Sequence, residues 1–414
     1  MKHLYNLIVL FTQTLLPVIA LVHKKIHFFV NGRKETFEKL KKLNHQKTIW
    51  FHVSSLGEFE QAIPILEALK KQHKNHKILV SFFSPSGYEN QKDYPLADVV
   101  CYLPLDTLKN AKRFINSVNL SIAIFIKYEF WPNFLHQLQK TKIPTILVSG
   151  IFRKQQVFFK PYGGFMRKAL QCFDYFFVQD ENSKKLLHSI HLSNSSVAGD
   201  TRFDRVSQIV KQNSNLDFIE VFIDKKHSFV AGSSWIEDEN IIVNYINTKA
   251  TENEKFIIAP HNIKAEGIKR LQKSIQKKTV LYSELLQDWF DKDLKDAQVL
   301  LIDAIGFLTK IYRYANVAYV GGGLKTGLHN ILEPATFGIP IIIGKNYDKF
   351  KEAKELVKLN GCYAIENQSD FDIVYTKLKT DVSFRKNTGT INGTYVKENT
   401  GATEKIINYI NKLL

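Results

Sequence analysis

Cysteine is scarce in this 414-residue sequence, and the three that occur, Cys101, Cys172 and Cys362, lie far apart. They form no CxxC pair and have no ligand spacing with histidine, so neither a disulfide framework nor a zinc site is indicated. Their isolation predicts three thiols buried as small apolar side chains. Two phosphate motifs are also missing: without GxxxxGK[ST] or GxGxxG, the sequence argues against a P-loop and against a dinucleotide-binding turn.

Acidic residues are few relative to basic ones. The chain has 57 Lys and Arg against 40 Asp and Glu, a formal net charge of +17. Such a surplus favours an anionic partner, such as acidic lipid or a phosphorylated substrate, although solvated helix faces are an equally simple explanation. The lysines are scattered and no RNA- or DNA-binding motif is legible, so nucleic acid is not expected as a partner.

Long apolar runs are missing except at the N-terminus. Leu4–Val22 is almost wholly apolar, with Asn6, Gln13 and Pro17 among the residues that interrupt it. At about 1.5 Å per residue a helix of this length approaches the ~30 Å hydrocarbon core of a bilayer. Basic residues follow at once, which predicts that the main body lies in the cytoplasm. We expect residues 1–30 to form a membrane anchor, spanning or interfacial; a signal peptide and an ordinary buried helix are the alternatives.

The rest of the chain alternates short apolar runs with amphipathic segments, the pattern of βαβ units and parallel sheets. A polar stretch, 207–227, predicts a linker between an N-terminal Rossmann-like domain at 31–206 and a C-terminal one at 228–395, with a final helix at 396–414. The fold class is therefore α/β, with two doubly wound domains facing a cleft. In sugar chemistry that is the glycosyltransferase-B (GT-B) architecture, here with an N-terminal membrane-anchor helix.

Two acidic residues follow predicted strands of the first domain. Glu58 comes after Thr48–Val53, in the first turn of a helix, and Glu129 comes after Ser121–Ile126. At the same rim they suit a general base and a supporting carboxylate, although Glu58 taken alone is better explained as complementing the positive end of its helix. Trp131, two residues past Glu129, is suited either to the core or to stacking on a sugar.

A third candidate stands before the linker. Arg202 is placed to neutralise a phosphate or carboxylate, and an ion pair with Asp200 or Asp204 is the competing account.

Small residues follow two predicted strands of the second domain. Gly232, Ser233 and Ser234 precede a helix and form a weak anion-site signal, because Ser234 is equally suited to be an N-cap. Pro260 and His261 follow the next strand and reach the same edge.

The strongest pattern is the run from Val320 to Pro334. Its glycines, which include Gly322 and Gly323, allow backbone N–H groups to approach a ligand closely. Asn330 is predicted to cap the next helix, and Glu333 to accept hydrogen bonds from ribose hydroxyls. A purely structural turn does not need His329, Asn330 and Glu333 together, so the run favours nucleotide binding.

Taken in order and spacing, these segments resemble those of the Kdo transferases, the 3-deoxy-D-manno-octulosonic acid transferases of lipopolysaccharide synthesis. The joint presence of SxGE, ExWPN and HNxLEP carries the resemblance, which runs over nearly the whole chain. The segments concerned are Val53–Glu58, Tyr128–Asn133, Gly199–Asp204, Gly232–Ser234, Pro260–His261 and Gly321–Pro334.

The resemblance implies an inverting transfer, without metal or cofactor, from CMP-Kdo to the 6′-hydroxyl of the tetraacyl lipid A precursor (lipid IVA). It implies a protein on the cytoplasmic face of the bacterial inner membrane, held there by anionic lipid. Glu58 looks like the general base, and Glu129 and Arg202 like the groups that stabilise the transition state. The positions that resemble CMP contacts are Pro260, His261, Ile305, Gly306, Phe307, Asn330, Ile331, Leu332 and Glu333; Gly232, Ser233, Ser234, Gly322, Gly323 and His329 complete the candidate nucleotide site.

The chain departs from the family pattern at Arg202, where lysine is common, at His261, where arginine is common, and at Phe307, where an acidic residue is common. Two alternative functions stay open. One is a GT-B enzyme of envelope synthesis that uses another nucleotide sugar, and the other is a non-catalytic nucleotide- or lipid-binding scaffold.

Overall fold

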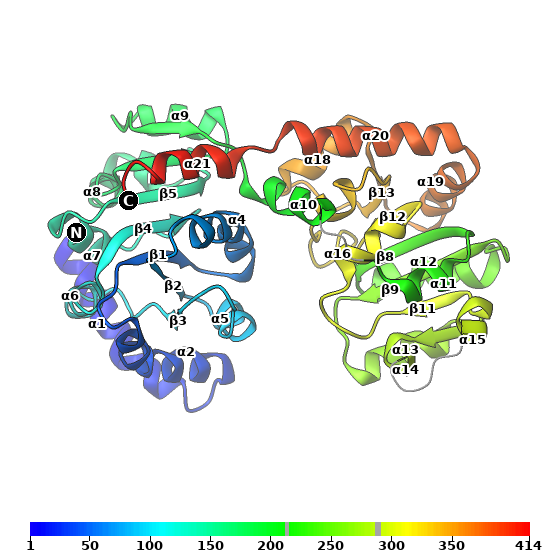
Figure 1. Ribbon diagram of the computed structural model, residues 1–414, viewed down its shortest axis with the longest axis horizontal. Coiled ribbons are helices and arrows are strands. Elements are labelled where there is room, and N and C mark those ends of the chain that lie inside the picture. Colours follow the sequence, from blue (N-terminus) through cyan, green and yellow to red (C-terminus); the bar gives the residue numbers. More distant parts are fainter. Residues whose placement is uncertain (212–214, 286–290) are drawn as a thin grey trace. The chain divides into compact units, whose positions relative to one another are not determined.

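The computed structural model describes residues 1–211, 215–285 and 291–414, and it divides into two compact units (Figure 1). The N-domain is Met1–Arg205 together with Asn399–Leu414, and the C-domain is Val206–Glu398. Residues 212–214 of the expected linker lie outside the described residues. The rest of 207–227 includes the end of helix α10 (Thr201–Lys211) and helix α11 (Asp217–Ile223).

The N-domain is built on seven parallel strands in the order β3-β2-β1-β4-β5-β6-β7. Most of their residues are buried, because helices cover both faces, and this explains why the strands are continuous apolar runs in the sequence. The strands are β1 (Thr48–Val53), β2 (Lys77–Phe82), β3 (Val99–Tyr102), β4 (Leu120–Ile126), β5 (Thr145–Gly150), β6 (Tyr175–Val178) and β7 (Ser195–Val197).

Two apolar clusters fill the space between this sheet and its helices, one containing Trp50, Phe125 and Phe134, the other Phe51 and Ile63. The C-terminal helix α21 (Ala402–Ile410) packs against α4 and adds its apolar face to the second cluster. The other helices are α3 (Thr36–Leu40), α4 (Leu56–Gln72), α5 (Pro85–Gln91), α6 (Leu108–Asn116), α7 (Pro132–Lys140), α8 (Gly164–Leu170) and α9 (Glu181–His188).

The C-domain repeats the plan, with seven parallel strands in the order β10-β11-β9-β8-β12-β13-β14. The strands are β8 (His227–Ser234), β9 (Glu254–Pro260), β10 (Thr279–Leu281), β11 (Val299–Leu301), β12 (Val317–Val320), β13 (Ile341–Gly344) and β14 (Cys362–Ile365). The helices are α12 (Ile236–Thr248), α13 (Ala265–Ser274), α14 (Tyr282–Leu285), α15 (Asp291–Asp296), α16 (Leu308–Ile311), α17 (Leu332–Ala335), α18 (Lys351–Lys358), α19 (Gln368–Thr380) and α20 (Val382–Glu398).

The prediction of two parallel α/β sheets is confirmed, and so is the burial of the three cysteines as free thiols. Two helices predicted in the C-domain are shorter than expected. The segment 306–314 holds one α-helical turn, α16, followed by a 3-10 turn, and 331–337 holds only the single turn α17. A turn at 336–338 follows α17, and it includes Gly338 with a left-handed φ of +67°.

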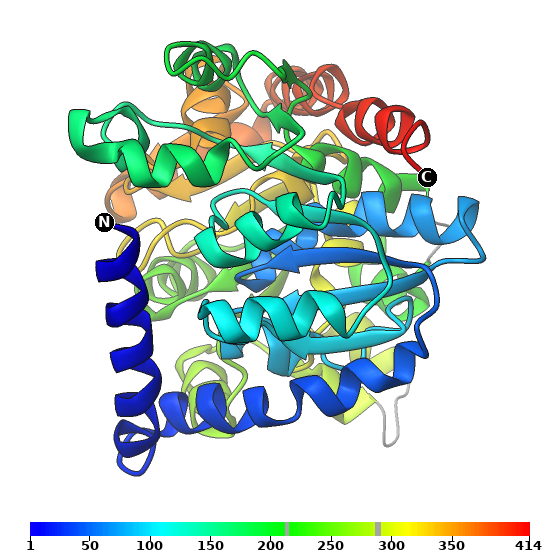
Figure 2. The ribbon, with the colours of Figure 1, turned by 90° about the vertical axis from the view of Figure 1, so that its left-hand side faces the viewer.

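The apolar N-terminal segment forms helix α1 (Lys2–Ile19), which is followed by α2 (Lys24–Lys34). Figure 2 shows both as dark blue helices along the margin of the N-domain. Within the described ranges, no helix combines the length and the apolar character needed to cross a bilayer. The Tyr5 hydroxyl donates to Asp106 at 2.7 Å, and the Asn133 amide donates to Asn6 at 2.9 Å, so polar contacts fasten α1 to the domain.

The outward side of α1 is apolar and exposed. None of its residues is buried, and large side chains stand in solvent, among them Leu7 (64% exposed), Phe11 (65%) and Val18 (63%). The alternative of an ordinary buried helix is therefore wrong for this segment. Of the polar residues of α1, Tyr5 and Asn6 contact the domain, while Lys2, His3, Thr12 and Thr14 are exposed.

Candidate active site

The sheet order of the N-domain defines one special edge. The chain passes from β1 to β2 on one side and from β4 to β5 on the other, so the neighbouring strands β1 and β4 form the topological switch point. Ligands of open parallel sheets bind outside the carboxyl ends of the strands at this point. Glu58 follows β1 and Glu129 follows β4, so the structure brings together the two carboxylates that the sequence placed on one rim.

Glu58 is the third residue of α4 and is only 8% exposed. Its Oε2 accepts a hydrogen bond from the Ser54 N–H at 2.5 Å, just before the helix begins. The carboxylate therefore does complement the N-terminus of its helix, the structural role that the sequence left open. Burial, and next the charge of Glu129, raise the pKa of Glu58 to about 7, against the lowering effect of the backbone N–H groups and Lys127.

Glu129 is held in a buried polar network. Its Oε2 accepts from the Trp131 indole N–H at 2.8 Å and lies 3.1 Å from His52 Nε2. The His52 ring is fully buried, and its Nδ1 lies 2.9 Å from the Ser81 hydroxyl, which also accepts from the Trp50 indole at 2.8 Å. Every partner of Glu129 is thus fixed by a further contact, which holds its carboxylate in one orientation.

The roles of Trp131 and His52 differ from the expectation. Trp131 was weighed as core or as a sugar platform, but its indole orients Glu129 and its ring packs on Phe83 at 4.5 Å between centroids. His52 was not recognised from the sequence. A polar residue at the end of the otherwise apolar run Thr48–Val53 was the available signal.

Lys127 is the second residue that the sequence did not single out. It directly follows β4 with φ of +67°, a left-handed conformation that is uncommon for a residue with a side chain. Its charge lowers the pKa of Glu58, in opposition to Glu129. A non-glycine residue in this conformation beside two carboxylates is typical of a functional site.

Arg202 makes the ion pair that was its competing account. Its Nη2 lies 2.8 Å from Asp200 Oδ2 and its Nε donates to the same oxygen at 2.9 Å. Asp200 is buried and also accepts from Gln61, and the nearby guanidinium is the strongest of the partners that hold the pKa of Asp200 below its usual range. Asp204 accepts from the Gly401 N–H at 2.6 Å and the Thr403 N–H at 2.7 Å, at the start of α21.

The C-domain has its own switch point between β8 and β12. Gly232–Ser234 ends β8, and the glycine run Gly321–Gly323 follows β12 directly. Pro260 ends β9, and Ile305–Phe307 comes soon after β11. Since β11, β9, β8 and β12 are successive neighbours in the sheet, the candidate nucleotide residues share one edge of the C-domain.

The glycines at this edge are required by packing. A Cβ on Gly232 would lie 2.0 Å from the Tyr312 hydroxyl, and one on Gly321 2.3 Å from the Ser233 carbonyl oxygen. A Cβ on Gly323 would meet the Gly344 backbone at 2.7 Å. The absence of side chains at these glycines therefore lets the ends of β8 and β13 pack closely against the segment that follows β12, and this holds with or without a ligand.

Two of the amides in the run are already used. The Gly321 N–H donates to the Gly232 carbonyl at 2.9 Å, and the Gly322 N–H donates to Asp238 Oδ2 at 2.8 Å. Asp238 also accepts from the Trp235 N–H at 2.9 Å and from the Tyr319 hydroxyl at 2.7 Å, so this buried carboxylate clamps the run to α12. The expectation that the glycines present their N–H groups to a ligand is therefore wrong at Gly321 and Gly322.

Three aromatic rings stack beside the run. Trp235 and His261 are parallel with centroids 4.6 Å apart, His261 and His329 are 4.5 Å apart, and the Trp235 indole donates to His329 Nε2 at 3.0 Å. Burial, and then the neighbouring His261, lower the pKa of His329 to about 4. His329 is therefore a neutral hydrogen-bond acceptor at pH 7.

The polar side chains of the HNxLEP segment make more hydrogen bonds within the protein than predicted. Asn330 is not the N-cap of α17, which is Ile331; instead the Asn330 Oδ1 accepts from the Leu332 N–H at 3.1 Å. Its Nδ2 donates to Glu333 Oε1 at 3.2 Å, and Thr309 donates to Glu333 Oε2 at 2.7 Å. Ile331 and Leu332 are buried, so of this set Asn330 and Glu333 are the partly accessible polar members.

The loop before α16 lies beside them. Ile305 is 83% exposed, and Gly306 has φ of +98° with open space around it. Phe307 packs on Tyr282 with ring centroids 4.7 Å apart. Among the residues the structure describes, no group of three His, Cys, Asp or Glu side chains could hold a metal ion.

Comparison with solved structures gives the class of the fold. UDP-GlcNAc 2-epimerase from Neisseria meningitidis, in a complex with UDP-GlcNAc, aligns with 88% of this chain and 100% of its own, with a TM-score of 0.60 and 17% sequence identity. Together with the two parallel sheets, this likeness defines a GT-B-like fold.

Sequence comparisons identify the family. A family model described as 3-deoxy-D-manno-octulosonic-acid transferase (kdotransferase) matches residues 31–205. The 3-deoxy-D-manno-octulosonic acid transferase of Aquifex aeolicus is 26% identical over 88% of this chain and 96% of its own. A bifunctional glycosyltransferase/methyltransferase of Fusobacterium nucleatum is 26% identical over 89% of this chain, which spans 58% of that longer protein. Residues 31–205 thus match the Kdo transferase family model, and most of the chain is similar to Kdo transferases, which are glycosyltransferases.

Proposed function

We propose that this protein transfers Kdo, with inversion, from CMP-Kdo to the 6′-hydroxyl of lipid IVA, with Glu58 as the general base. The observation that carries the proposal is the buried carboxylate pair at the switch point of the N-domain, in which the pKa of Glu58 is raised to about 7. A base with a pKa near the working pH is deprotonated in a useful fraction of molecules and still accepts a proton readily.

The proposed step uses the residues of this chain as follows. The Glu58 carboxylate takes the proton of the acceptor hydroxyl, whose oxygen forms a bond to the anomeric carbon of Kdo. The bond from that carbon to the CMP phosphate breaks, and CMP leaves with the electron pair. Glu129, held by Trp131 and His52, keeps its charge close to the reacting centre and favours the protonated form of Glu58 as the reaction proceeds.

We assign donor binding to the switch point of the C-domain. The stack of Trp235, His261 and His329 offers a flat surface for a nucleobase, and Asn330 and Glu333 offer hydrogen-bond partners beside it. The relatives named as 3-deoxy-D-manno-octulosonic acid transferases support Kdo as the transferred sugar. Arg202, paired with Asp200, would stabilise developing negative charge through the positive charge of its guanidinium.

We further propose that the protein works on the cytoplasmic face of the bacterial inner membrane, with α1 in the interface rather than across the bilayer. Leu7, Phe11 and Val18 form part of an exposed apolar surface, while Tyr5 and Asn6 tie the helix to the N-domain. Such a surface buries its apolar area among lipid chains, and the net charge of +17 favours an anionic leaflet.

The test is transfer by purified full-length protein with CMP-Kdo generated in place and lipid IVA as acceptor. A lipid product heavier by Kdo, absent with Glu58→Gln and present with the matched variant Glu60→Gln on the same helix, is the expected result. UDP-sugars serve as competing donors: product from one of them, and none from CMP-Kdo, would replace the Kdo assignment by another GT-B transferase.

A further inference from the structure

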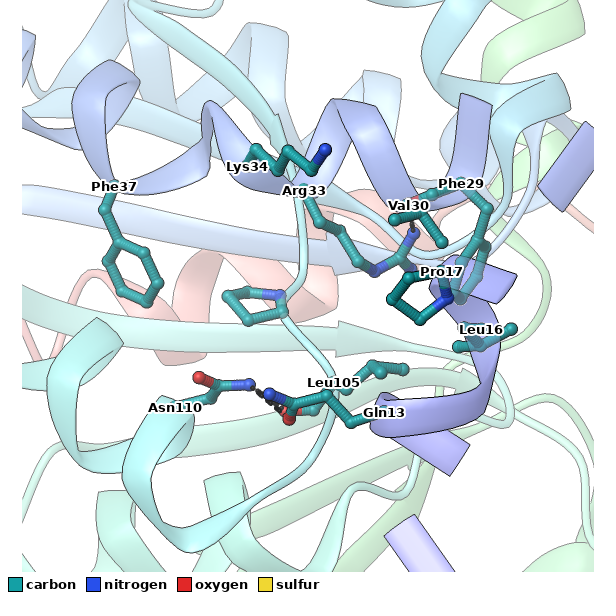
Figure 3. A pocket seen from close by; sticks show the side chains of 11 residues that line it. Gln13, Leu16, Pro17, Phe29, Val30, Arg33, Lys34, Phe37, Leu105 and Asn110 are labelled. Carbon is teal, nitrogen blue, oxygen red and sulfur yellow. Dashed lines mark hydrogen bonds between the residues drawn. The ribbon is translucent and has the colours of Figure 1, made fainter. Parts of the chain in front are cut away.

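A cavity of about 270 Å³ lies between α1, α2 and the segment that follows β3 (Figure 3). Its walls are mainly apolar, with Leu16, Phe29, Val30 and Leu105 among the lining residues. Gln13 and Asn110 close one side with a hydrogen bond of 3.5 Å. The volume and lining suit a single hydrocarbon chain better than a nucleotide or a free sugar.

Arg33 lines this cavity and is the feature that needs explanation. Its guanidinium donates to the Phe29 and Phe83 carbonyl oxygens, each at 2.8 Å, and lies over the Phe29 ring at 3.4 Å. A guanidinium has five N–H donors, and the buried Nε–H makes no hydrogen bond. Among the residues that the structure describes, no carboxylate forms an ion pair with Arg33. Burial lowers the pKa of Arg33 to about 9, which leaves it charged at pH 7.

The position of this charge is fixed by the fold. Helix α2 rests on β3 at Gly32, where a Cβ would lie 2.2 Å from the Tyr102 ring. The guanidinium lies 4.9 Å from the Phe83 ring centroid, and Phe83 packs on Trp131, which donates to Glu129. The cavity is therefore connected by direct contacts to the carboxylate pair at the same edge of the sheet.

A half-buried cation with an unpartnered, buried Nε–H and without a counter-ion, beside an apolar cavity, calls for a ligand that is both anionic and apolar. We propose that this cavity is a subsite for the acylated, phosphate-bearing acceptor, which lays one acyl chain against Val30 and Leu105 and pairs its phosphate with Arg33. The assignment rests on the proposed function, and it adds where the acceptor is held. A planar guanidinium matches a phosphate through paired hydrogen bonds, which an exposed lysine does not offer in the same way.

The first arm of the test measures binding without any transfer. Decyl phosphate is titrated against the full-length protein by calorimetry, beside inorganic phosphate and decanol. Decyl phosphate is expected to bind best, and Arg33→Gln to weaken it by about tenfold or more, as for a lost charge-assisted hydrogen bond. The matched control is Arg167→Gln, because Arg167 also donates to two main-chain carbonyls of the N-domain but does not line the cavity.

The second arm measures kinetics with lipid IVA in detergent. Arg33→Gln is expected to raise the acceptor KM about tenfold while kcat and the donor KM change by less than about twofold, and Arg33→Lys to restore part of the loss. Val30→Trp, which fills the cavity and leaves Arg33 in place, is expected to raise the acceptor KM as well. Dephosphorylated acceptor should show no difference between wild type and Arg33→Gln.

Equal binding of decyl phosphate by wild type and Arg33→Gln would overturn the subsite. An unchanged acceptor KM in both Arg33→Gln and Val30→Trp would also overturn the subsite. If Arg33→Gln in addition bound vesicles of anionic phospholipid less well, the cavity would be a membrane-lipid site and not an acceptor site. If decyl phosphate binds in an Arg33-dependent way and no Kdo is transferred, the proposed function fails and the lipid phosphate site stands.

Discussion

The two switch points use acidic residues in opposite ways. In the N-domain, Glu58 and Glu129 are buried together, and burial with mutual repulsion keeps the pKa of Glu58 near 7. In the C-domain, Asp238 is fully engaged by N–H and O–H donors, and Glu333 accepts from Asn330 and Thr309. The same position in the same fold thus supports proton transfer in one domain and a rigid loop in the other, and the number of donors around the carboxylate decides which.

The largest effect should come from removing the acid–base group. Glu58→Gln keeps an acceptor for the Ser54 N–H but cannot take a proton, so kcat should fall by about 10²–10⁴-fold. Glu60→Gln, on the same helix, should stay within about threefold of wild type. Steady-state rates of Kdo transfer measure both, and equal rates for the two variants would remove Glu58 from the chemistry.

The same carboxylate predicts a pH dependence of stability. The pKa of Glu58 in the folded protein lies above its usual value, so folding favours the protonated form. Wild type should lose up to about 3 kcal/mol of stability as pH rises from about 4.5 to about 7, roughly 2 kcal/mol of it above pH 5.5, and Glu58→Gln should not lose it. Urea denaturation at pH 5.5 and pH 8.5 gives the change in the free energy of unfolding for each protein. An equal change in wild type and Glu58→Gln would contradict the raised pKa.

Glu129→Gln should have the next largest effect. The rate at the optimum should fall about 10²-fold, because the fixed charge is lost. The acid limb of kcat/KM, expected near pH 7 in wild type, should move to lower pH, since the repulsion that raises the pKa of Glu58 is gone. A pH–rate profile measures the shift. An acid limb at the same pH in Glu129→Gln and wild type would show that Glu129 does not raise the pKa of Glu58.

A smaller effect is expected at the C-domain. Trp235→Ala removes the ring that stacks on His261 and should raise the donor KM by about tenfold, with the acceptor KM unchanged. Lys325→Gln, which breaks only the surface pair with Glu237 in the same region, is the control and should change the donor KM by less than about twofold. Because His329 is neutral over this range, it should contribute no step to the donor KM between pH 6 and 8. A step in the wild-type profile that is absent in His329→Gln would contradict the lowered pKa of His329.

The smallest effect on activity should come from Asp204. Asp204→Asn weakens its hydrogen bonds to the start of α21 and should lower stability by about 2 kcal/mol, while kcat at 25 °C stays within about twofold. Denaturant unfolding and limited proteolysis near residue 399 measure it. Unchanged stability would show that α21 is held by its apolar face alone.

Much of the fold was predictable because buried parallel strands are written as continuous apolar runs. Thr48–Val53, Tyr175–Val178, Val317–Val320 and Cys362–Ile365 have the predicted bounds. The rim position of Glu58 and Glu129 followed from strand order alone. Helix ends such as that of α17 were less predictable, because the apolar pattern continues through 336 and 337, where the chain forms a turn.

What the sequence could not show depends on contacts between distant residues. His52 meets Glu129, which is 77 positions away, and Arg33 meets the Phe83 carbonyl, which is 50 positions away. The sequence left Asp200 and Asp204 as alternative partners of Arg202; the structure pairs Arg202 with Asp200, and it brings Asp204 to α21, which comes from the far end of the chain. A pattern identifies such residues as candidates, and only the fold selects their partners.

The discontinuity of the N-domain has a consequence for its synthesis. Its core includes Ala402, Ile406 and Ile410 of α21, which are made after the whole of the C-domain. On the ribosome, the domain with the carboxylate pair emerges first, yet it leaves an apolar face of β-sheet and α4 uncovered until the last helix appears. The C-domain is a single stretch of chain and is therefore the first domain that can finish folding. A truncation just before α21 would destabilise the N-domain, although most of the N-domain lies at the other end of the sequence.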